Sequence, residues 1–251
     1  KEKFIYSSDE LRRRQFLAGM NIEDLELILH PMVEDEKEAV GSMGDDTPTA
    51  VLSDRYRPLS HFFRQNFSQV TNPPIDSLRE NEVMSLKTRF GNLGNILDFE
   101  NLTQENIYVL DSPILSNSQF EKFTEFFKKN IKVLDCTFDT KINLKTRLDQ
   151  LRSEAEIAVR EGAKHLILSD LQINDKRSPI PMILSIGAIN SKLVNLGIRG
   201  FASINVQTGE ALDTHSFAVL LGVGATTINP YIAFDSIHQR YEKKLFGKLN
   251  F

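Results

Sequence analysis

The chain has 251 residues, of which 41% are hydrophobic and 25% are charged, and its formal net charge is −4 at pH 7. This composition is typical of a soluble globular protein, and the absence of a long Lys or Arg block argues against a nucleic-acid partner. No apolar run approaches the ~20 residues that a membrane span needs, so we expect no membrane partner either.

The cysteine count limits the redox chemistry. The single cysteine, Cys136, cannot form an intramolecular disulfide, and a structural zinc site needs several Cys or His ligands. The setting is therefore expected to be reducing, in the cytoplasm or a plastid stroma. Cys136 follows a short apolar run, which favours a small buried side chain over a reactive thiol. Because the sequence opens "KEKFIYSSDE" without Met, we expect a piece of a longer polypeptide.

Residues 1–104 have the pattern of helices and loops. The stretch "SSDELRRRQFLAGM" predicts a helix capped by Ser7 or Ser8. The next run, "NIEDLELILH", predicts a helix capped by Asn21 that ends before Pro31, because proline disfavours a helical residue in front of it. A long loop rich in Gly, Asp and Pro follows.

The stretch "LSHFFRQNF" predicts one more helix in this part of the chain. Its apolar residues recur at helical spacing, which is typical of a core-facing stripe. These residues are Leu59, Phe62, Phe63 and Phe67.

Residues 105–251 read as repeated β/α units. Short apolar runs predict strands at 107–110, 131–135, 165–169, 201–206 and 225–228. Caps and stop signals predict the helices between and after them, at Ser118, Gly162, Gly197, Asp213 and Asn229. Such alternation predicts an α/β fold with a parallel sheet, in a single domain overall. An open sheet and an incomplete (β/α) TIM-barrel-like sheet both fit, and five units fall short of a complete barrel.

Two glycines in "LLGVGATTIN" do not predict a phosphate-binding loop. Gly222 and Gly224 come after a helix and before a strand, whereas dinucleotide-binding loops come after a strand and before a helix. They are interpreted as a helix end and a tight turn.

The loops that follow two predicted strands hold the candidate polar site residues, because ligands bind at the carboxyl edge of a parallel sheet. In "NVQTGEALD", at 205–213, the candidates are Gln207, Thr208 and Glu210. An ordinary β–α loop whose Asp213 caps the next helix also fits, and is favoured.

The loop at 168–181 is long for a β–α connection and carries Asp170, so a partner contact is possible there. The five histidines of the chain form neither a helical metal pair nor a Ser–His–Asp arrangement. The residues therefore predict no catalytic, cofactor-binding or metal residue in this chain.

The stretch "SQVTNPPIDSLRE" contains two adjacent prolines. Pro73 and Pro74 each fix φ near −65°, and Asn72 is pushed into an extended conformation. Thr71 and Asn72 can offer a hydroxyl and an amide to a small polar molecule. A stiff turn that starts a helix at Pro74 is the alternative.

Three stretches resemble the central domain of the large subunit of glutamate synthase, in order from about Leu25 to Phe234. These are "GSMGDDTPTAVLSDRYRPLSHFFRQNFSQVTNPPIDSLRE", "HLILSDLQINDKRSPIPMILSIGAIN" and "QTGEALDTHSFAVLLGVGATTINPYIAF". The strings TNPPID and LLGxGAxxINPY are specific to this resemblance.

The resemblance implies a role inside a larger enzyme. Glutamate synthase moves the amide nitrogen of glutamine onto 2-oxoglutarate and reduces the product to glutamate. An amidotransferase domain releases ammonia, and an FMN-binding barrel domain with a nearby iron–sulfur cluster carries out the reduction. The central domain joins these two domains, resembles an incomplete version of the barrel, and partly walls the ammonia tunnel.

Several expectations follow from this resemblance. The partners are the amidotransferase and FMN-binding domains of the same parent chain, with a reductase subunit or ferredoxin as the electron source. FMN and the iron–sulfur cluster belong to the parent enzyme, and this chain alone is non-catalytic. Residues 71–74 become candidates for the tunnel wall or an interdomain contact.

The sequence also departs from the family pattern. Gln207 and Leu212 stand where the family loop E-T-G-E-A-R has an acid and a base, and "GAINSK" lacks the usual histidines. Two other functions stay open. One is a free-standing TIM-barrel-type enzyme that uses Asp170 or Glu210 at strand ends. The other is a regulatory binding module that uses the 168–181 loop.

Overall fold

The computed structural model describes residues 6–38, 43–45, 47–54, 56–64, 75–76, 78–91, 97–98, 100 and 107–247. The predicted tunnel residues, Thr71 to Pro74, lie outside this part of the chain. The chain divides into two compact units, one of Lys1–Gln65 with Ile114–Phe251 and one of Asn66–Pro113. Among the described residues, none of the helices has the length and apolarity needed to cross a membrane.

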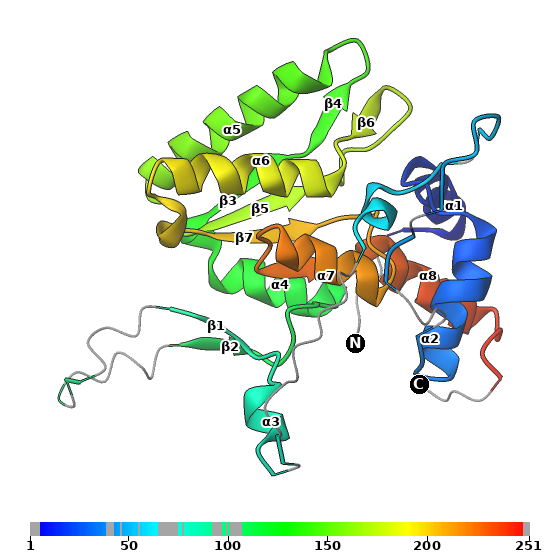
Figure 1. Cartoon of the computed structure of the whole chain (residues 1–251), viewed down its shortest axis with the longest axis horizontal. Helices are drawn as coiled ribbons and strands as arrows, with labels where there is room; N and C mark the ends of the chain where they lie inside the picture. The colour runs from blue at the N-terminus through cyan, green and yellow to red at the C-terminus, as the bar shows by residue number, and fades with distance from the viewer. Residues whose placement is uncertain are drawn as a thin grey trace. The chain divides into compact units, whose positions relative to one another are not determined.

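The larger unit is built on a four-stranded sheet in the order β3-β5-β7-β8, with all neighbouring pairs parallel (Figure 1). The strands are β3 (Ile131–Asp135), β5 (His165–Ser169), β7 (Ser203–Gln207) and β8 (Thr227–Asn229). The first two match the predicted strands. The last two begin two residues later than predicted, and a 3₁₀ turn at Arg199–Phe201 precedes β7.

One face of the sheet is apolar because side chains alternate along each strand. The row Leu134, Leu168, Val206 and Ile228 lies in register across all four strands. These residues belong to the main core, which also includes residues of three helices. The helices are α5 (Leu144–Arg160), α6 (Met182–Asn195) and α7 (Thr214–Gly222). The predicted stop signals Gly162 and Gly197 have positive φ just beyond α5 and α6.

The opposite face of the sheet is more polar, and helix α4 (Asn117–Phe126) crosses it. Ile114 forms a parallel bridge to Ile228 at one edge of the sheet, and β3 lies at the other edge, so α4 must pass from one edge to the other. The Phe123 ring of α4 meets the His165 ring edge-on at a centroid distance of 5.6 Å. Helices therefore cover both faces of the sheet (Figure 1).

The predicted strand at 107–110 exists, but its expected place in the parallel sheet is wrong. In the smaller unit, β2 (Tyr108–Leu110) pairs antiparallel with β1 (Thr88–Phe90), and α3 (Glu80–Val83) lies between residues 78 and 84. The position beside β8 is held instead by the segment at Ile114, because Leu115 N–H donates to the Ile228 carbonyl at 2.8 Å.

An additional pair of strands was not predicted. β4 (Thr137–Asp139) follows β3 closely and pairs antiparallel with β6 (Arg177–Pro179), which lies within the 168–181 loop. The loop is long because it contains β6.

The predicted end of the second helix before Pro31 is wrong. After α1 (Ser8–Leu17), the chain forms a π-helical segment, Asp24–Leu29, and continues directly into α2 (His30–Glu34). Pro31 follows the π-helical segment directly, at a point where the regular i→i−4 ladder of hydrogen bonds is already interrupted. The predicted Asn21 cap is confirmed, since its Oδ1 accepts from the Glu23 and Asp24 N–H groups.

Two further local predictions need correction. The expected phenylalanine stripe forms only a 3₁₀ turn, Leu59–Phe62, in which Phe62 is exposed and the Arg57 guanidinium lies over its ring. Phe67 lies outside the described residues. The capping box of α4 uses Ser116 and Gln119, two residues before the predicted Ser118, because Asn117 already belongs to the helix.

The remaining caps agree closely with prediction. Asp213 caps α7 through a capping box with Ser216. Helix α7 ends at Gly222, and Gly224 turns into β8 with φ of 125°, so the helix-end interpretation of both glycines is confirmed. Helix α8 (Tyr231–Glu242) starts one residue later than predicted, with Pro230 rather than Asn229 at its N-cap.

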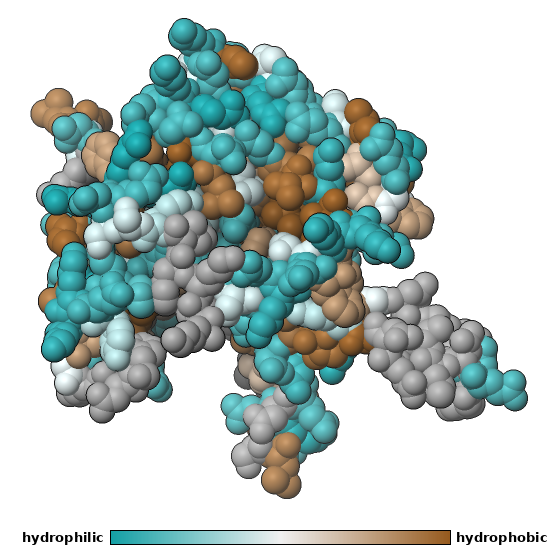
Figure 2. Space-filling view, turned by 180° about the vertical axis from the view of Figure 1, so that it is seen from behind, coloured by the Kyte–Doolittle hydropathy of each residue, from teal (hydrophilic) through white to brown (hydrophobic). Residues whose placement is uncertain are grey.

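The parallel α/β class is confirmed, but the described strands close no barrel. Figure 2 shows apolar patches among mostly hydrophilic side chains on the face opposite to the view of Figure 1.

Candidate functional site at the carboxyl edge of the sheet

The carboxyl ends of the four parallel strands meet at one edge of the sheet, where α/β folds generally bind ligands. The last residues of the strands lie in register across this edge: Asp135, Ser169, Gln207 and Asn229. The loops that follow β5 and β7 carry the polar residues predicted from the sequence, so the fold brings them into one region.

Asp170 ties these two loops together. Its side chain is buried, and its Oδ2 accepts hydrogen bonds from Thr208 Oγ1 at 2.7 Å and from the Gly209 N–H at 3.0 Å. Burial raises the pKa of Asp170 above its usual range, and these hydrogen bonds oppose that rise. A carboxylate whose lone pairs are occupied by its own chain acts as a structural clasp between loops.

Helix α1 covers this end of the sheet. Gln15 Nε2 donates to Ser236 Oγ of α8 at 2.7 Å, a contact buried between the two helices. Gly209 has no room for a side chain, because an added Cβ would lie 2.4 Å from Ile232 Cδ1 and 3.3 Å from Ala18 Cβ. The place above Asp170, where a ligand of a parallel sheet is expected, is therefore filled by the chain's own N-terminal helix.

Glu210 supports helix α6 from the neighbouring loop. Its Oε2 accepts a hydrogen bond from the N–H of Met182, the first residue of α6, at 2.8 Å. Burial raises the pKa of Glu210 to about 7, the Met182 N–H opposes this shift, and the charge of Asp170 adds to it. Glu210 also lines a groove of about 890 Å³ together with Tyr56 and His61. A carboxyl group that titrates near neutral pH is chemically able to exchange a proton there.

Gln207 belongs to a chain of side-chain hydrogen bonds across the edge. Ser169 Oγ donates to Gln207 Oε1 at 3.1 Å, and Gln207 Nε2 donates to Asn229 Oδ1 at 3.3 Å. Asn229 Nδ2 then donates to Asn117 Oδ1 at 2.9 Å, and Asn117 Nδ2 donates to Asp235 Oδ1 at 2.8 Å. The chain starts at a surface groove and ends at a buried carboxylate.

That groove, of about 900 Å³, lies between α4 and the polar face of the sheet. Its lining combines residues of all four parallel strands with one side of α4. The residues that line it at the strands are Ile131, Val133, Asp135, Ile167, Ser169, Gln207 and Asn229.

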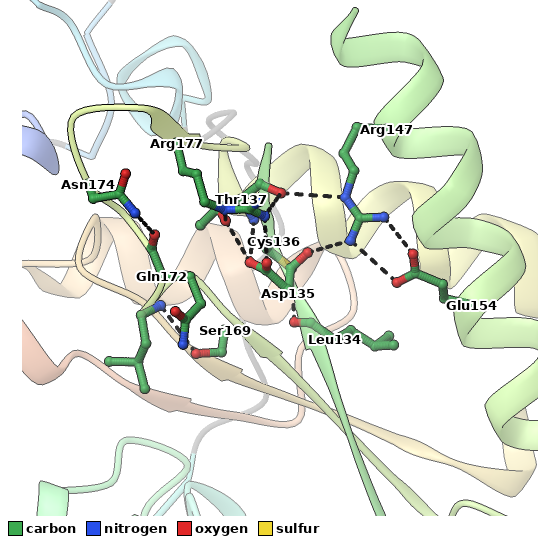
Figure 3. A network of polar contacts seen from close by, with 11 residues as sticks. Leu134, Asp135, Cys136, Thr137, Arg147, Glu154, Ser169, Gln172, Asn174 and Arg177 are labelled. Carbon is green, nitrogen blue, oxygen red and sulfur yellow. Dashed lines mark hydrogen bonds and ion pairs between the residues drawn. The ribbon is translucent and has the colours of Figure 1, made fainter. Parts of the chain in front are cut away.

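Two arginines hold the end of β3, and the sequence reasoning missed them. Arg177 donates to Asp135 Oδ2 at 2.6 Å and to Thr137 Oγ1 at 2.8 Å, while Arg147 donates to the Asp135 carbonyl at 2.7 Å (Figure 3). Arg147 is paired in turn with Glu154. Arg177 is 42 residues from Asp135 along the chain and Arg147 is 12 residues from it, and no local pattern in the sequence indicates these contacts.

The other candidates have plain structural roles or lie outside the described residues. Cys136 is fully buried, as expected, and burial raises the pKa of its thiol. Within the described ranges, no group of three or more His, Cys, Asp or Glu residues is placed to hold a metal ion. Residues 71–74 lie outside the described part of the chain.

Comparison with protein families identifies a match over nearly the whole chain. The family model described as "Glutamate synthase central domain" matches residues 13–250. The match includes both strand-end loops and the sheet that carries them.

Relatives of known name agree with this match. The chain is 55% identical over 243 residues to "Glutamate synthase [NADPH] large chain" of Azospirillum brasilense, covering 96% of this chain and 16% of the relative. It is 38% identical over 238 residues to the protein of the same name in Bacillus subtilis, covering 93% and 15%. It is 37% identical over 243 residues to "Ferredoxin-dependent glutamate synthase, chloroplastic" of Spinacia oleracea, covering 94% and 15%. The chain therefore spans about one-sixth of the length of these relatives.

The clasp around Asp170 predicts a large loss of stability for Asp170→Asn. Asp170 accepts on both oxygens, because the Gly209 N–H also lies 3.2 Å from Oδ1, whereas an amide has one acceptor oxygen and would turn its N–H₂ group toward this buried N–H, so we expect a loss of about 2–3 kcal/mol. Urea unfolding followed by circular dichroism measures it. The control is Asp175→Asn at an exposed ion pair with Arg13, which should cost less than ~1 kcal/mol. Equal effects of the two substitutions would contradict the clasp.

The raised pKa of Glu210 predicts a defined pH dependence. A carboxyl whose pKa is higher in the folded state than in the unfolded state stabilises the fold at low pH, and that contribution is lost as pH rises. Between pH 4.5 and pH 7.5, the wild-type chain should therefore lose roughly 1–3 kcal/mol relative to Glu210→Gln, whose amide oxygen can still accept from Met182. The measurement is the difference in unfolding free energy between the two proteins at each pH. A difference that stays constant with pH would refute this assignment.

Proposed function

This chain belongs to the family of glutamate synthase central domains, and from that membership we propose that it is the connecting domain of a glutamate synthase. In the parent enzyme it would join the glutaminase domain to the FMN-binding synthase domain and help to form the ammonia tunnel between them. The reaction of the parent enzyme would be the formation of glutamate from glutamine and 2-oxoglutarate. The names of the relatives, and the share of their length that the chain covers, support this proposal.

One observation favours a connecting role over a catalytic role. The part of the sheet edge around Asp170 is covered by α1, and the candidate acids Asp170 and Glu210 are held by the chain's own groups. Asp170 accepts from Thr208 and Gly209, and Glu210 accepts from the first N–H of α6. Side chains that hold loops and helices in place are suited to a rigid connector.

The cofactors of the parent enzyme do not fit the donor groups of this chain. An iron–sulfur cluster takes several thiolates, whereas the chain has one cysteine, and that cysteine is fully buried. A flavin phosphate needs free backbone N–H groups, but at this edge the Gly209 N–H is already bonded to a carboxylate. We therefore assign FMN and the iron–sulfur cluster to other domains of the parent enzyme.

The remaining partners are part of the same proposal. The parent enzyme would receive electrons from a reductase subunit or from ferredoxin, since relatives of both named kinds are similar to this chain. Its location would be the cytoplasm or a plastid stroma.

The open sheet of four parallel strands, extended by the bridge at Ile114, is compatible with an incomplete barrel.

The alternative of a free-standing enzyme has one observation in its favour. Glu210 lines a groove and titrates at about pH 7, which suits a general acid or base. Its hydrogen bond to Met182 and the position of α1 favour the structural role.

The proposal predicts that the purified chain is inert. When the chain is incubated with FMN and then passed through gel filtration in flavin-free buffer, it should be colourless. It should also release no ammonia from glutamine. Visible absorbance and an ammonia assay measure these outcomes. A flavin band that stays with the protein through gel filtration, or ammonia release that Glu210→Gln abolishes, would favour the enzymatic alternative.

The tunnel role is tested in the parent enzyme by Thr71→Val, which keeps the side-chain shape and removes the hydroxyl. Ammonia released from glutamine should then escape, so less glutamate should form for each glutamine hydrolysed. Each half-reaction should survive when it is assayed alone, with free ammonia supplied to the synthase site. We expect the substitution to change stability by less than ~1.5 kcal/mol.

Thr146→Val, at an exposed position of α5, is the matched control and should keep the wild-type ratio of glutamate formed to glutamine hydrolysed. If Thr71→Val also keeps that ratio, Thr71 has no tunnel role and the double proline is a stiff turn.

A further inference from the structure

The groove between α4 and the polar face of the sheet is unused by the proposed connecting role. Its volume of about 900 Å³ lies in the range of small-molecule pockets, roughly 300–1,000 Å³. It lies at the carboxyl ends of β3, β5 and β7, beside the part of the edge that α1 covers. At this edge of a parallel sheet, backbone and side-chain groups are accessible to a ligand.

Part of the groove is lined by apolar side chains of β3, β5 and α4. Val133 stands on the exposed edge strand with 58% of its surface accessible, and Ile131 precedes it on the same face of β3. Ile167 pairs with Val133 across the sheet, and Phe120 of α4 lines the opposite wall. These side chains provide contact area for a flat apolar body.

Gln207 provides the polar group at the carboxyl end of the groove. Its amide oxygen accepts from Ser169, and one of its two N–H groups donates to Asn229. A primary amide has two N–H donors and an oxygen with two lone pairs. These two hydrogen bonds therefore leave one N–H donor and one oxygen lone pair of Gln207 for a ligand. Both belong to the same planar amide group.

The charges around this end of the groove favour a neutral ligand. Asp135 lines the groove and is paired with Arg177, which is not among the lining residues (Figure 3). Glu121 and Glu125 of α4 add negative charge to the lining. Among the described lining residues, Lys128 is the one cation, and it precedes Ile131 at the opposite end of β3. Ile131 and Asp135 are four positions apart along β3, a distance of about 13 Å. A carboxylate beside Gln207 would thus lose water without gaining a cation.

We propose that this groove binds a flat apolar molecule that carries a neutral carboxamide, as a primary amide or within a ring. The ligand carbonyl accepts from the remaining N–H of Gln207, and the ligand N–H donates to the remaining lone pair of the Gln207 oxygen. The ring lies against Ile167 and Val133, the apolar lining residues nearest to Gln207. This inference concerns a site apart from the tunnel and does not depend on the proposed function.

Benzamide and benzoate are matched probes, because they share a ring and shape but differ in charge. Each is titrated into the 251-residue chain, with backbone NMR signals of Ser169, Gln207 and Asn229 as the readout. Benzamide should give saturable shifts at these residues with a Kd on the order of millimolar, as expected for so small a molecule. Benzoate should bind at least about fivefold more weakly, since no cation faces its carboxylate.

Two exposed valines provide the matched variants. Val133→Ser shortens the wall of the groove and should weaken benzamide binding by about fivefold, whereas Val194→Ser, on α6 outside the lining, should leave it unchanged. Gln207→Leu removes the amide and should abolish the preference for benzamide over benzoate. Circular dichroism checks that each variant is folded, and if Gln207→Leu does not fold, the two valine variants decide.

The proposal is overturned if benzamide produces no saturable shifts at the groove, or if benzoate binds equally well. It is also overturned if Val133→Ser and Val194→Ser bind benzamide alike.

Discussion

The row of Leu134, Leu168, Val206 and Ile228 is the packing interaction on which the larger unit depends. These four side chains lie in register across the parallel sheet, and each is at most 1% exposed. At about 25 cal/mol for each Å² of apolar surface removed from water, one such layer contributes several kcal/mol. A shift of any strand by one residue would turn its apolar row to the opposite face, so the layer also fixes the register.

Fixing that register determines the polar edge. Because the apolar row packs against the helices α5, α6 and α7, the residues one position further along each strand must face the other side of the sheet. Ser169, Gln207 and Asn229 therefore meet in one hydrogen-bonded series. A buried polar group is expensive unless it is paired, and this series satisfies its members while leaving one planar amide at the groove. Core packing and the candidate ligand site thus have a common physical origin.

The candidate residues on the strand-end loops could be predicted in position but not in role. The apolar runs before Asp170 and Gln207 indicate strands, and a parallel sheet places strand ends together. What the Asp170 and Glu210 carboxylates contact could not be read locally, because Asp170 accepts from Thr208, 38 positions away, and Glu210 accepts from Met182, 28 positions away. The contact between Gln15 and Ser236 spans 221 positions, and no periodic pattern indicates it. The enzymatic interpretation of Asp170 and Glu210 stayed open in the sequence for this reason.

Local signals alone determined the helices and parallel strands of residues 131–247. Gly162, Gly197 and Asp213 acted through backbone geometry or capping hydrogen bonds that involve only neighbouring residues. Tertiary structure decided which segment joined which sheet: Tyr108–Leu110 has a strand pattern, but Ile114 forms the bridge beside β8. It also decided that a helix continues through Pro31, and that Arg177 and Arg147 close around Asp135. Partner choice depends on distant hydrogen bonds and packing, which a short window of sequence does not contain.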